Sequence, residues 1–243
     1  MDLRGKTYWI VGASEGLGRA LAEELDRRGT RLVLSARNGE RLQSLAQTLT
    51  QDAKTVTIDV ADTNSVKQAY ADVGPIDGVI YVAGLYEPMA AQDWKAETVE
   101  AICDVNFMGA VRVLGQAVPE FTKADAGHIV LIGSLSGYRG LPGATGYGAS
   151  KAALMHMAES LQADLWSTGV KVQLFNPGFI RTRLTDKNQF SMPFIVEPEK
   201  AADIIANGME RNAFRLDFPW LFSKFFRITR LLPQFVFQSL FAR

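Results

Sequence analysis

Tyr147 and Lys151 lie four residues apart, and Ser134 lies thirteen residues before the tyrosine. On a helix, residues four apart share one face, so the lysine is expected one turn from the phenol. An isolated tyrosine has a pKa of about 10 and is a poor base at neutral pH. A neighbouring ammonium group stabilises the phenolate and lowers that pKa. With a serine hydroxyl to hold a carbonyl oxygen, the three residues predict proton exchange with a carbonyl or alcohol group.

A second motif is a glycine-rich turn between a predicted strand and a predicted helix. Its glycines follow the apolar run 7–11. Glycines let the backbone approach a pyrophosphate closely, and the amino end of a helix favours negative charge. In the first strand–helix unit this spacing favours a dinucleotide site over a plain tight turn. The residues predicted to contact the cofactor here are Gly12, Ser14, Glu15, Gly16, Leu17 and Gly18.

The end of the second predicted strand indicates which dinucleotide binds. A carboxylate there would bind the ribose hydroxyls of NAD, whereas an arginine can pair with the 2′-phosphate of NADP. Residues 35–38 contain no acid, and Arg37 lies among them. NADP(H) is therefore predicted. Glu15 argues against this prediction, because a carboxylate near a phosphate is unfavourable.

These motifs need a scaffold, and the chain alternates short apolar runs with segments of helical spacing. The nearly continuous apolar character of the runs is typical of a parallel sheet covered by helices on both faces. We predict an α/β fold, a doubly wound parallel sheet of the Rossmann type, in a single domain. The predicted strands are 7–11, 31–35, 55–58, 78–82, 128–132 and 170–175, and the predicted helices are 17–28, 39–49, 64–73, 98–121 and 147–168.

Taken in this order, the motifs resemble the short-chain dehydrogenase/reductase family over about residues 5–210. The resemblance implies that Asp59 contacts the adenine, that Lys151 also holds the nicotinamide ribose, and that Thr182 meets the carboxamide. It implies that Asn106 supports a water-linked proton relay beside Ser134 and Tyr147. The other cofactor positions that it implies are Val60, Ala83, Gly84, Tyr147, Pro177 and Gly178.

Two positions depart from the family pattern. The family usually has threonine before the first glycine of the turn, where this chain has Val11. It usually has two asparagines after the fourth strand, where this chain has Tyr81 and Val82. Both changes fall on the scaffold around the cofactor, and the proton-transfer residues are all present.

Residues 184–197, here called the substrate loop, fall where such enzymes close over their substrate. Phe190, Met192, Phe194 and Ile195 are apolar enough to line a lipophilic pocket. A lid packed on its own core is the alternative.

The last segment, 218–243, is treated as a C-terminal extension of the 1–217 catalytic domain. It contains no acid, four basic residues and many aromatic residues. A basic amphipathic segment of this kind can lie on an anionic membrane, cover the substrate mouth or form a subunit interface. Helices around Asn106 and Tyr147 often pair between subunits in the family, so the resemblance implies a homodimer.

Composition limits the remaining classes. The counts of Lys plus Arg and of Asp plus Glu are both 26, which gives no bulk attraction to nucleic acid. Cys103 is the only cysteine, so no disulfide within the chain is expected. The two histidines and this cysteine are widely separated in the sequence, which predicts no metal site. The first residues show no basic-then-apolar leader, and a cytoplasmic location is the expectation.

Together, the residues predict an oxidoreductase that transfers hydride between NADP(H) and a ketone or secondary alcohol, with a small lipophilic substrate. Two alternatives stay open at this point. One is a 3-oxoacyl thioester reductase, and the other is a non-catalytic NADP-binding sensor or membrane-docking protein.

Overall fold

The computed structural model describes residues 2–188 and 190–241, which form a seven-stranded parallel sheet covered by helices on both faces. The strand order is β3-β2-β1-β4-β5-β6-β7. This is the predicted doubly wound arrangement: β2 and β3 are added on one side of β1, and β4 to β7 are added on the other. The strands are β1 (Thr7–Val11), β2 (Arg31–Ala36), β3 (Lys54–Thr57), β4 (Gly78–Tyr81), β5 (Gly127–Ile132), β6 (Val170–Pro177) and β7 (Arg215–Phe218).

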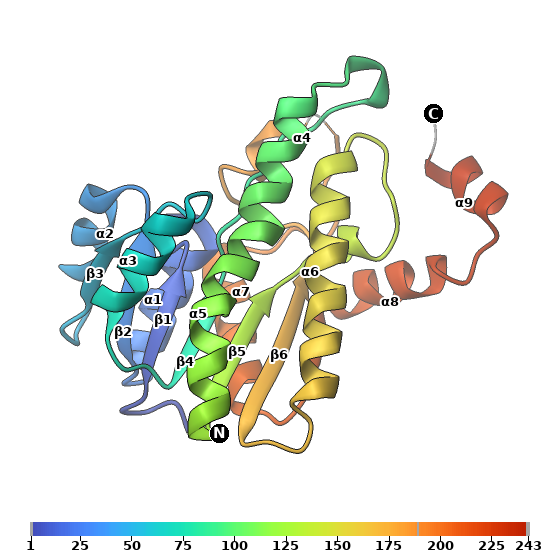
Figure 1. Cartoon of the computed structure of the whole chain (residues 1–243). Helices are drawn as coiled ribbons and strands as arrows, with labels where there is room; N and C mark the ends of the chain where they lie inside the picture. Colours follow the sequence, from blue (N-terminus) through green and yellow to red (C-terminus); the bar gives the residue numbers. More distant parts are fainter. Residues whose placement is uncertain (1, 189, 242–243) are drawn as a thin grey trace.

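The helices form one layer on each face of the sheet, and Figure 1 shows α5 and α6 in front of it and α7 behind. In the part of the chain that the structure describes, α3, α5 and α6 share one buried apolar cluster with the sheet, and α1, α2 and α7 share another. The helices are α1 (Gly16–Arg27), α2 (Gly39–Ala46), α3 (Thr63–Val73), α4 (Ala96–Cys103), α5 (Gly109–Ala124), α6 (Thr145–Asp164), α7 (Pro198–Glu210), α8 (Trp220–Thr229) and α9 (Gln234–Phe241).

Strand β1 shows why the strands read as continuous apolar runs. Successive side chains of a strand point to opposite faces of the sheet. Trp9 and Val11 enter the cluster with α3, α5 and α6, whereas Tyr8 and Ile10 enter the cluster with α1, α2 and α7. All four side chains are buried, because helices cover both faces.

The six predicted strands are confirmed to within two residues at either end. Strand β7 and helix α7 were not predicted. The predicted helix 98–121 is a composite, in which a π-helix, Asp104–Met108, joins α4 to α5. Its full span, Ala96–Ala124, is the one helix among the described residues that is long and apolar enough to cross a membrane. Ile102, Val113 and Phe121 on it are buried.

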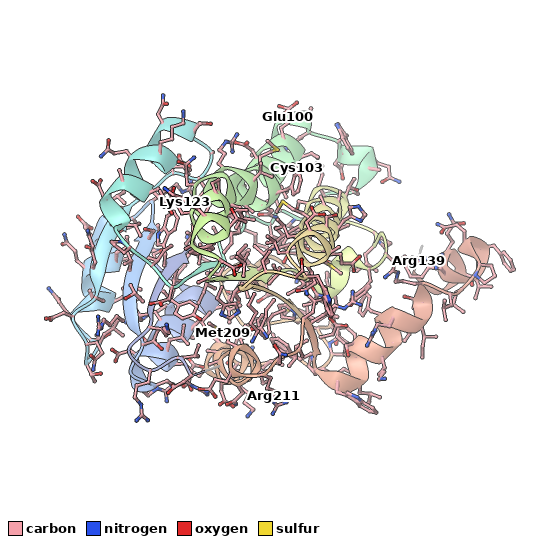
Figure 2. The ribbon with its side chains drawn as sticks, turned by 60° about the horizontal axis from the view of Figure 1, so that its bottom comes forward. Glu100, Cys103, Lys123, Arg139, Met209 and Arg211 are labelled. Atoms are coloured by element: carbon pink, nitrogen blue, oxygen red, sulfur yellow. The ribbon has the colours of Figure 1, made fainter. Side chains whose placement is uncertain are left out.

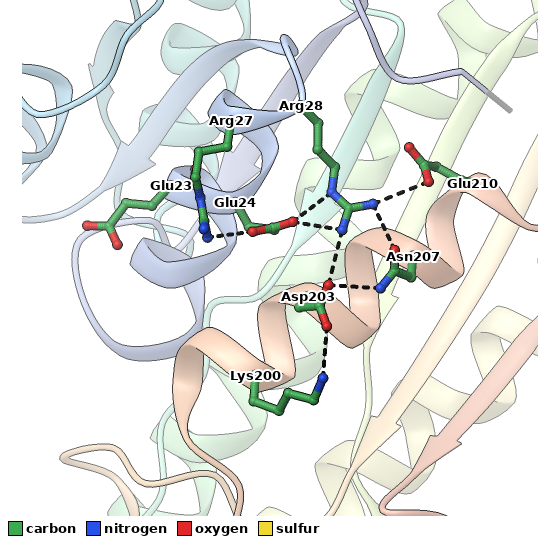
Figure 3. A network of polar contacts seen from close by, with 8 residues as sticks. All are labelled: Glu23, Glu24, Arg27, Arg28, Lys200, Asp203, Asn207 and Glu210. Atoms are coloured by element: carbon green, nitrogen blue, oxygen red, sulfur yellow. Dashed lines mark hydrogen bonds and ion pairs between the residues drawn. The ribbon is translucent and has the colours of Figure 1, made fainter.

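A charged network joins α1 to α7, as Figure 3 shows. The Arg28 guanidinium contacts the carboxylates of Glu24 at 2.7 Å, Asp203 at 3.3 Å and Glu210 at 3.2 Å. It also donates to Asn207 Oδ1 at 3.0 Å. The Arg28 side chain is largely buried, and its Nε, Nη1 and Nη2 groups all donate to these partners. The pairs therefore hold α1 in place more firmly than isolated surface pairs would.

A second polar network lies at the amino end of the sheet, away from the predicted site. Tyr8 Oη lies 2.7 Å from His128 Nδ1, and His128 Nε2 lies 3.0 Å from Gln173 Oε1. The Gln173 amide donates in turn to the carbonyl of Ala213 at 2.7 Å. Burial, with a smaller contribution from Lys171, lowers the pKa of His128 to about 3.

This buried histidine predicts acid sensitivity. Between pH 6.5 and about 3 the unfolded chain binds a proton that the folded protein does not, so stability falls as pH falls through that window. We expect the free energy of unfolding to drop about 2–3 kcal/mol more in the wild type than in His128→Gln between pH 7 and pH 4. Urea unfolding at the two pH values measures this difference. His156→Gln, which changes an exposed histidine, is the control, and an equal drop in wild type and His128→Gln would contradict the assignment.

Candidate active site

A cleft of about 700 Å³ opens at the carboxyl ends of β1, β2, β4, β5 and β6. All sixteen predicted cofactor residues line it, from Gly12 in the glycine turn to Thr182 after β6. A hollow of similar volume lies at the amino ends of the strands, around Lys6 and Tyr70. None of the predicted site residues lines it. Chemistry is therefore assigned to the carboxyl-end cleft, where ligands of open α/β sheets gather.

The glycine turn is as tight as its residue types suggest. Gly12 has φ +105° and Gly16 has φ +55°, a backbone region that favours glycine. A side chain at Gly18 would place its Cβ 2.0 Å from the carbonyl oxygen of Gly12. Helix α1 begins at Gly16 and no side chain caps its first turn, so its backbone N–H groups can receive an anionic ligand. The turn fits a dinucleotide pyrophosphate.

The carboxylate in this turn is paired with two arginines. Glu15 contacts Arg41 at 2.6 Å and Arg183 at 2.5 Å. Arg37, directly after β2, lines the same part of the cleft. Two cations therefore pair with Glu15 and a third lines the same cleft, so the carboxylate is offset by more than one positive charge. Arg41 and Arg183 were missed from the sequence, because only the fold brings α2 and the segment after β6 to the glycine turn.

The segment after β3, where Asp59 and Val60 lie, is tied to the helix on the other side of the cleft. Arg112 donates to the Val60 carbonyl at 3.0 Å and forms an ion pair with Asp104 at 2.7 Å. Asp59 Oδ1 accepts from the backbone of Ala61 at 3.0 Å. These bonds hold Asp59, the predicted adenine contact, and its neighbour Val60 in the lining of the cleft.

The predicted proton-transfer residues come together at the carboxyl end of β5 and the first turns of α6. Ser134 lies two residues after the end of β5, and Tyr147 lies in the first turn of α6. The two side chains share a hydrogen bond. One turn further along α6, Lys151 donates to the Ile132 carbonyl at 2.8 Å and lies 5.8 Å from the centre of the Tyr147 ring. Tyr147 and Lys151 therefore share a helix face, as predicted, and both line the cleft.

The electrostatics of this pair differ from the prediction. Burial raises the pKa of Tyr147 to about 12, Tyr86 raises it slightly further, and the Ser134 hydrogen bond opposes the rise. Burial lowers the pKa of Lys151 to about 8. The expectation that Lys151 brings the phenol toward neutral pH is wrong for this geometry, because the ammonium bonds Ile132 and desolvation dominates. At neutral pH Tyr147 is a neutral phenol, the protonation state of a proton donor.

Asn106 lies on the π-helix between α4 and α5, and its side chain is fully buried. Its Oδ1 accepts from the Leu85 backbone at 2.6 Å, and its Nδ2 donates to the Leu85 carbonyl at 3.0 Å and to Ser150 Oγ at 2.9 Å. The asparagine thus joins the loop after β4 to the helix that carries Tyr147 and Lys151. Single-turn π segments often occur at functional sites. The water-linked relay itself stays a prediction.

The departure at Tyr81 has a structural explanation. Its ring is buried at the end of β4, and its hydroxyl donates to the Val105 carbonyl at 2.5 Å within the π-helix. The phenol therefore anchors the segment that carries Asn106. A side chain at Gly109 would place its Cβ 2.4 Å from this hydroxyl, so the glycine leaves room for it. Val82 packs against the glycine turn near Gly18.

Tyr86 is a site residue that sequence reasoning missed. Its ring lies edge-on to the Tyr147 ring, with centroids 5.0 Å apart, and its hydroxyl donates to Asn188 Oδ1 at 2.7 Å. It therefore connects Tyr147 to the substrate loop. No motif marks this position, because an aromatic residue in a loop has no sequence signal of its own.

The substrate loop contains a short 3₁₀ turn, Thr185–Lys187, and two exposed aromatic rings. Phe190 contacts Phe179 at 5.9 Å between centroids, and Phe194 contacts Phe222 of α8 at 5.8 Å. Both rings are more than half exposed, at 55% and 53%, so the loop does not pack them into a core of its own. Met192 Sδ accepts from the Asn188 amide at 3.3 Å.

Comparisons with known proteins agree with this geometry. The family model for short chain dehydrogenases matches residues 6–191. An uncharacterized oxidoreductase of Myxococcus xanthus is 36% identical over 245 residues, which cover 98% of this chain and 97% of that protein. One of Staphylococcus epidermidis is 33% identical over 211 residues, which cover 85% and 92%.

Solved structures extend the likeness to the fold. A short-chain dehydrogenase from Streptomyces avermitilis superposes with a TM-score of 0.84 at 25% identity, covering 93% of this chain and 92% of that one. A short chain dehydrogenase from Burkholderia cenocepacia, solved in complex with NADP, superposes with a TM-score of 0.87 at 23% identity over the whole of both chains.

Proposed function

The chain belongs to the short-chain dehydrogenase/reductase family of oxidoreductases, and we propose that it transfers hydride between NADP(H) and a lipophilic ketone or secondary alcohol. The observation that carries this proposal is one cleft with different chemistry at its two ends. Arg37 and Arg41 lie at the end formed by β2 and α2, and Tyr147 and Lys151 lie at the other, with Ser134 beside them.

In the reductive direction, the Ser134 hydroxyl and the Tyr147 phenol hydrogen-bond the substrate carbonyl oxygen. NADPH, when bound, supplies the hydride that reaches the carbonyl carbon. Tyr147 donates its proton to the oxygen, and the Lys151 ammonium offsets the negative charge that develops on the phenol. Oxidation of an alcohol is the reverse sequence.

The preference for NADP(H) is supported by the charges around the glycine turn. The end of β2 offers no carboxylate for a ribose diol. Arg37 and Arg41 line the cleft beside it, and Glu15 is paired with Arg41 and Arg183. A 2′-phosphate here would meet arginine side chains, which bind phosphate through two parallel N–H groups.

A lipophilic substrate is supported by the residues around the mouth of the cleft. Phe179 and Phe190 are in ring contact there, and Tyr86 covers the catalytic phenol from the side of the substrate loop. Such a rim favours an apolar substrate body with one polar group aimed at Ser134 and Tyr147.

Cofactor selectivity tests the proposal directly. We expect Arg37→Ala and Arg41→Ala each to weaken NADPH binding about 10–100-fold, the effect of one lost charge-assisted contact, and to leave NADH binding unchanged. Fluorescence titration with both cofactors measures this. Arg31→Ala, which removes an exposed arginine at the opposite end of β2, is the matched control. Tighter binding of NADH than of NADPH by the wild type would overturn the cofactor assignment.

A second experiment identifies the reaction. The enzyme is screened for NADPH oxidation with ketones of graded chain length and with 3-oxoacyl thioesters. We expect turnover of ketones that rises with apolar length. Tight NADPH binding without turnover of either class would instead favour the sensor alternative.

A further inference from the structure

Exposed apolar side chains gather on one side of this protein. Among the described residues, eleven large apolar side chains are exposed, and eight of them belong to the substrate loop and the tail helices. Those eight are Phe190, Phe194, Trp220, Leu221, Phe225, Ile228, Leu231 and Phe235. Figure 1 shows α8 and α9 extending from the body beyond the last strands. The six tail residues of this group, Trp220 to Phe235, are here called the tail face.

Helix α8 has a distinct outward side. Leu221, Phe225 and Ile228 follow helical spacing on one face and are 59%, 43% and 58% exposed. Lys224 and Arg227 lie in the next row around the helix and are also exposed. The face toward the body holds Ser223, Phe226 and Thr229, all buried. Leu221 and Phe225 therefore lie on the outer side of α8, away from buried Phe226.

Aromatic contacts join α8 to the mouth of the cleft. The Phe222 ring lies 5.7 Å from Phe179, 5.8 Å from Phe194 and 5.0 Å from Phe226. Phe179 follows Gly178, a lining residue of the cleft. A side chain at Gly178 would place its Cβ 2.9 Å from the Phe222 ring, so helix α8 and the exposed Phe194 of the substrate loop lie next to a lining residue of the cleft.

The orientation of the tail is set by Arg139, which Figure 2 shows between the body and the tail helices. Its guanidinium donates to the carbonyls of Thr229 and Leu232 and to Gln234 Oε1 at 2.9 Å. It also lies 4.3 Å from the centre of the Phe237 ring. These bonds satisfy the carboxyl end of α8 and hold both tail helices against the loop after β5.

Charge indicates which occupant the tail face fits. Between Pro219 and Arg243 every charged side chain is basic, and there is no Asp or Glu. In a two-fold contact between two copies of this face, the exposed cations next to it, Lys224 and Arg227, would be brought near the same cations of the second copy. An anionic lipid surface instead meets basic residues with opposite charge and takes up tryptophan, phenylalanine and leucine at the depth of its head groups.

We propose that the tail face docks on an anionic lipid bilayer and turns the mouth of the cleft toward the bilayer, from which a lipophilic carbonyl substrate enters. The docking itself does not depend on the reaction. Entry of substrate from the bilayer rests on the proposed function.

Vesicle sedimentation with the full chain tests the docking. The probes are vesicles of phosphatidylcholine alone and of phosphatidylcholine with phosphatidylglycerol. We expect strong sedimentation only with the second, and an affinity at least about tenfold lower in the triple variant Leu221→Ser, Phe225→Ser, Ile228→Ser. Trp166→Ser removes an aromatic side chain that is 78% exposed after α6, far from the tail in sequence, and is the matched control with unchanged binding.

The readouts separate this proposal from the proposed function. NADPH titration of the triple variant reports whether the fold and the cleft are intact, and we expect wild-type affinity. Equal sedimentation of wild type and triple variant, or equal sedimentation with both kinds of vesicle, would overturn the docking. The docking would also be overturned if the wild type bound no vesicles and formed a dimer that the triple substitution converts to a monomer. The tail face would then be a subunit interface. Vesicle binding without NADPH turnover would leave the docking standing and remove the proposed reaction.

Discussion

Replacing Tyr147 by phenylalanine is expected to lower turnover about 10²–10⁴-fold, the range typical of a lost general acid. The substitution removes one hydroxyl and keeps the ring that packs edge-on against Tyr86. We therefore expect NADPH binding and the melting temperature to change little. Turnover with the best ketone of the screen and the NADPH dissociation constant, measured on the same preparation, separate a chemical defect from a binding defect.

Tyr138→Phe is the matched control for this substitution. The Tyr138 hydroxyl donates to Asp217 at 2.7 Å, and burial raises its pKa to about 12, as burial does for Tyr147. The two phenols thus have similar acidity and differ in position, since only Tyr147 lines the cleft. Comparable losses in both variants would mean that the effect is structural, and near-normal turnover of Tyr147→Phe would remove this residue from the mechanism.

Residues whose role depends on local spacing could be predicted from the sequence. The glycine turn has its signal within seven residues, and Tyr147 and Lys151 have theirs within one helical turn. Because parallel strands place their carboxyl ends at one end of the sheet, the order of the motifs was enough to bring Asp59 to the cleft and Ser134 to the cleft residue Tyr147.

Residues whose role depends on distant partners were missed. Arg41 and Arg183 matter through Glu15, which lies 26 and 168 positions away in the chain. The pKa of Tyr147 was predicted in the wrong direction for a related reason. Helical spacing places a lysine nearby, but burial, which dominates here, depends on residues distant in sequence such as Tyr86, whose ring packs against Tyr147.

Strand β7 was missed because its signal is weak. It is four residues long and lies at the edge of the sheet, where Arg215 and Asp217 interrupt the apolar pattern. The structure explains the acid, since Asp217 accepts from Tyr138 and from the Asn176 amide at 2.8 Å. Such cross-strand partners cannot be read from spacing along one segment.

Lys151→Met is expected to lower turnover at least about 10²-fold, because the variant keeps the volume of the side chain and removes the charge that supports the Tyr147 phenolate.

The same substitution has a distinct thermodynamic signature. Burial lowers the folded-state pKa of Lys151 from 10.5 to about 8. Between these two values the unfolded chain binds a proton that the folded protein does not, so the free energy of unfolding rises with pH in this window and Lys151 destabilises the fold at every pH below it.

The wild-type free energy of unfolding, relative to that of Lys151→Met, is therefore expected to rise on the order of 2 kcal/mol from pH 8 to pH 10. Urea unfolding of both proteins without cofactor measures the difference, in which other titrating groups cancel. The loss of the hydrogen bond to Ile132 shifts the Lys151→Met curve by a constant and leaves its slope unchanged. Parallel curves would show that Lys151 titrates as an exposed lysine. A rising difference together with lost turnover would show that the fold retains a destabilising charge where the chemistry requires it.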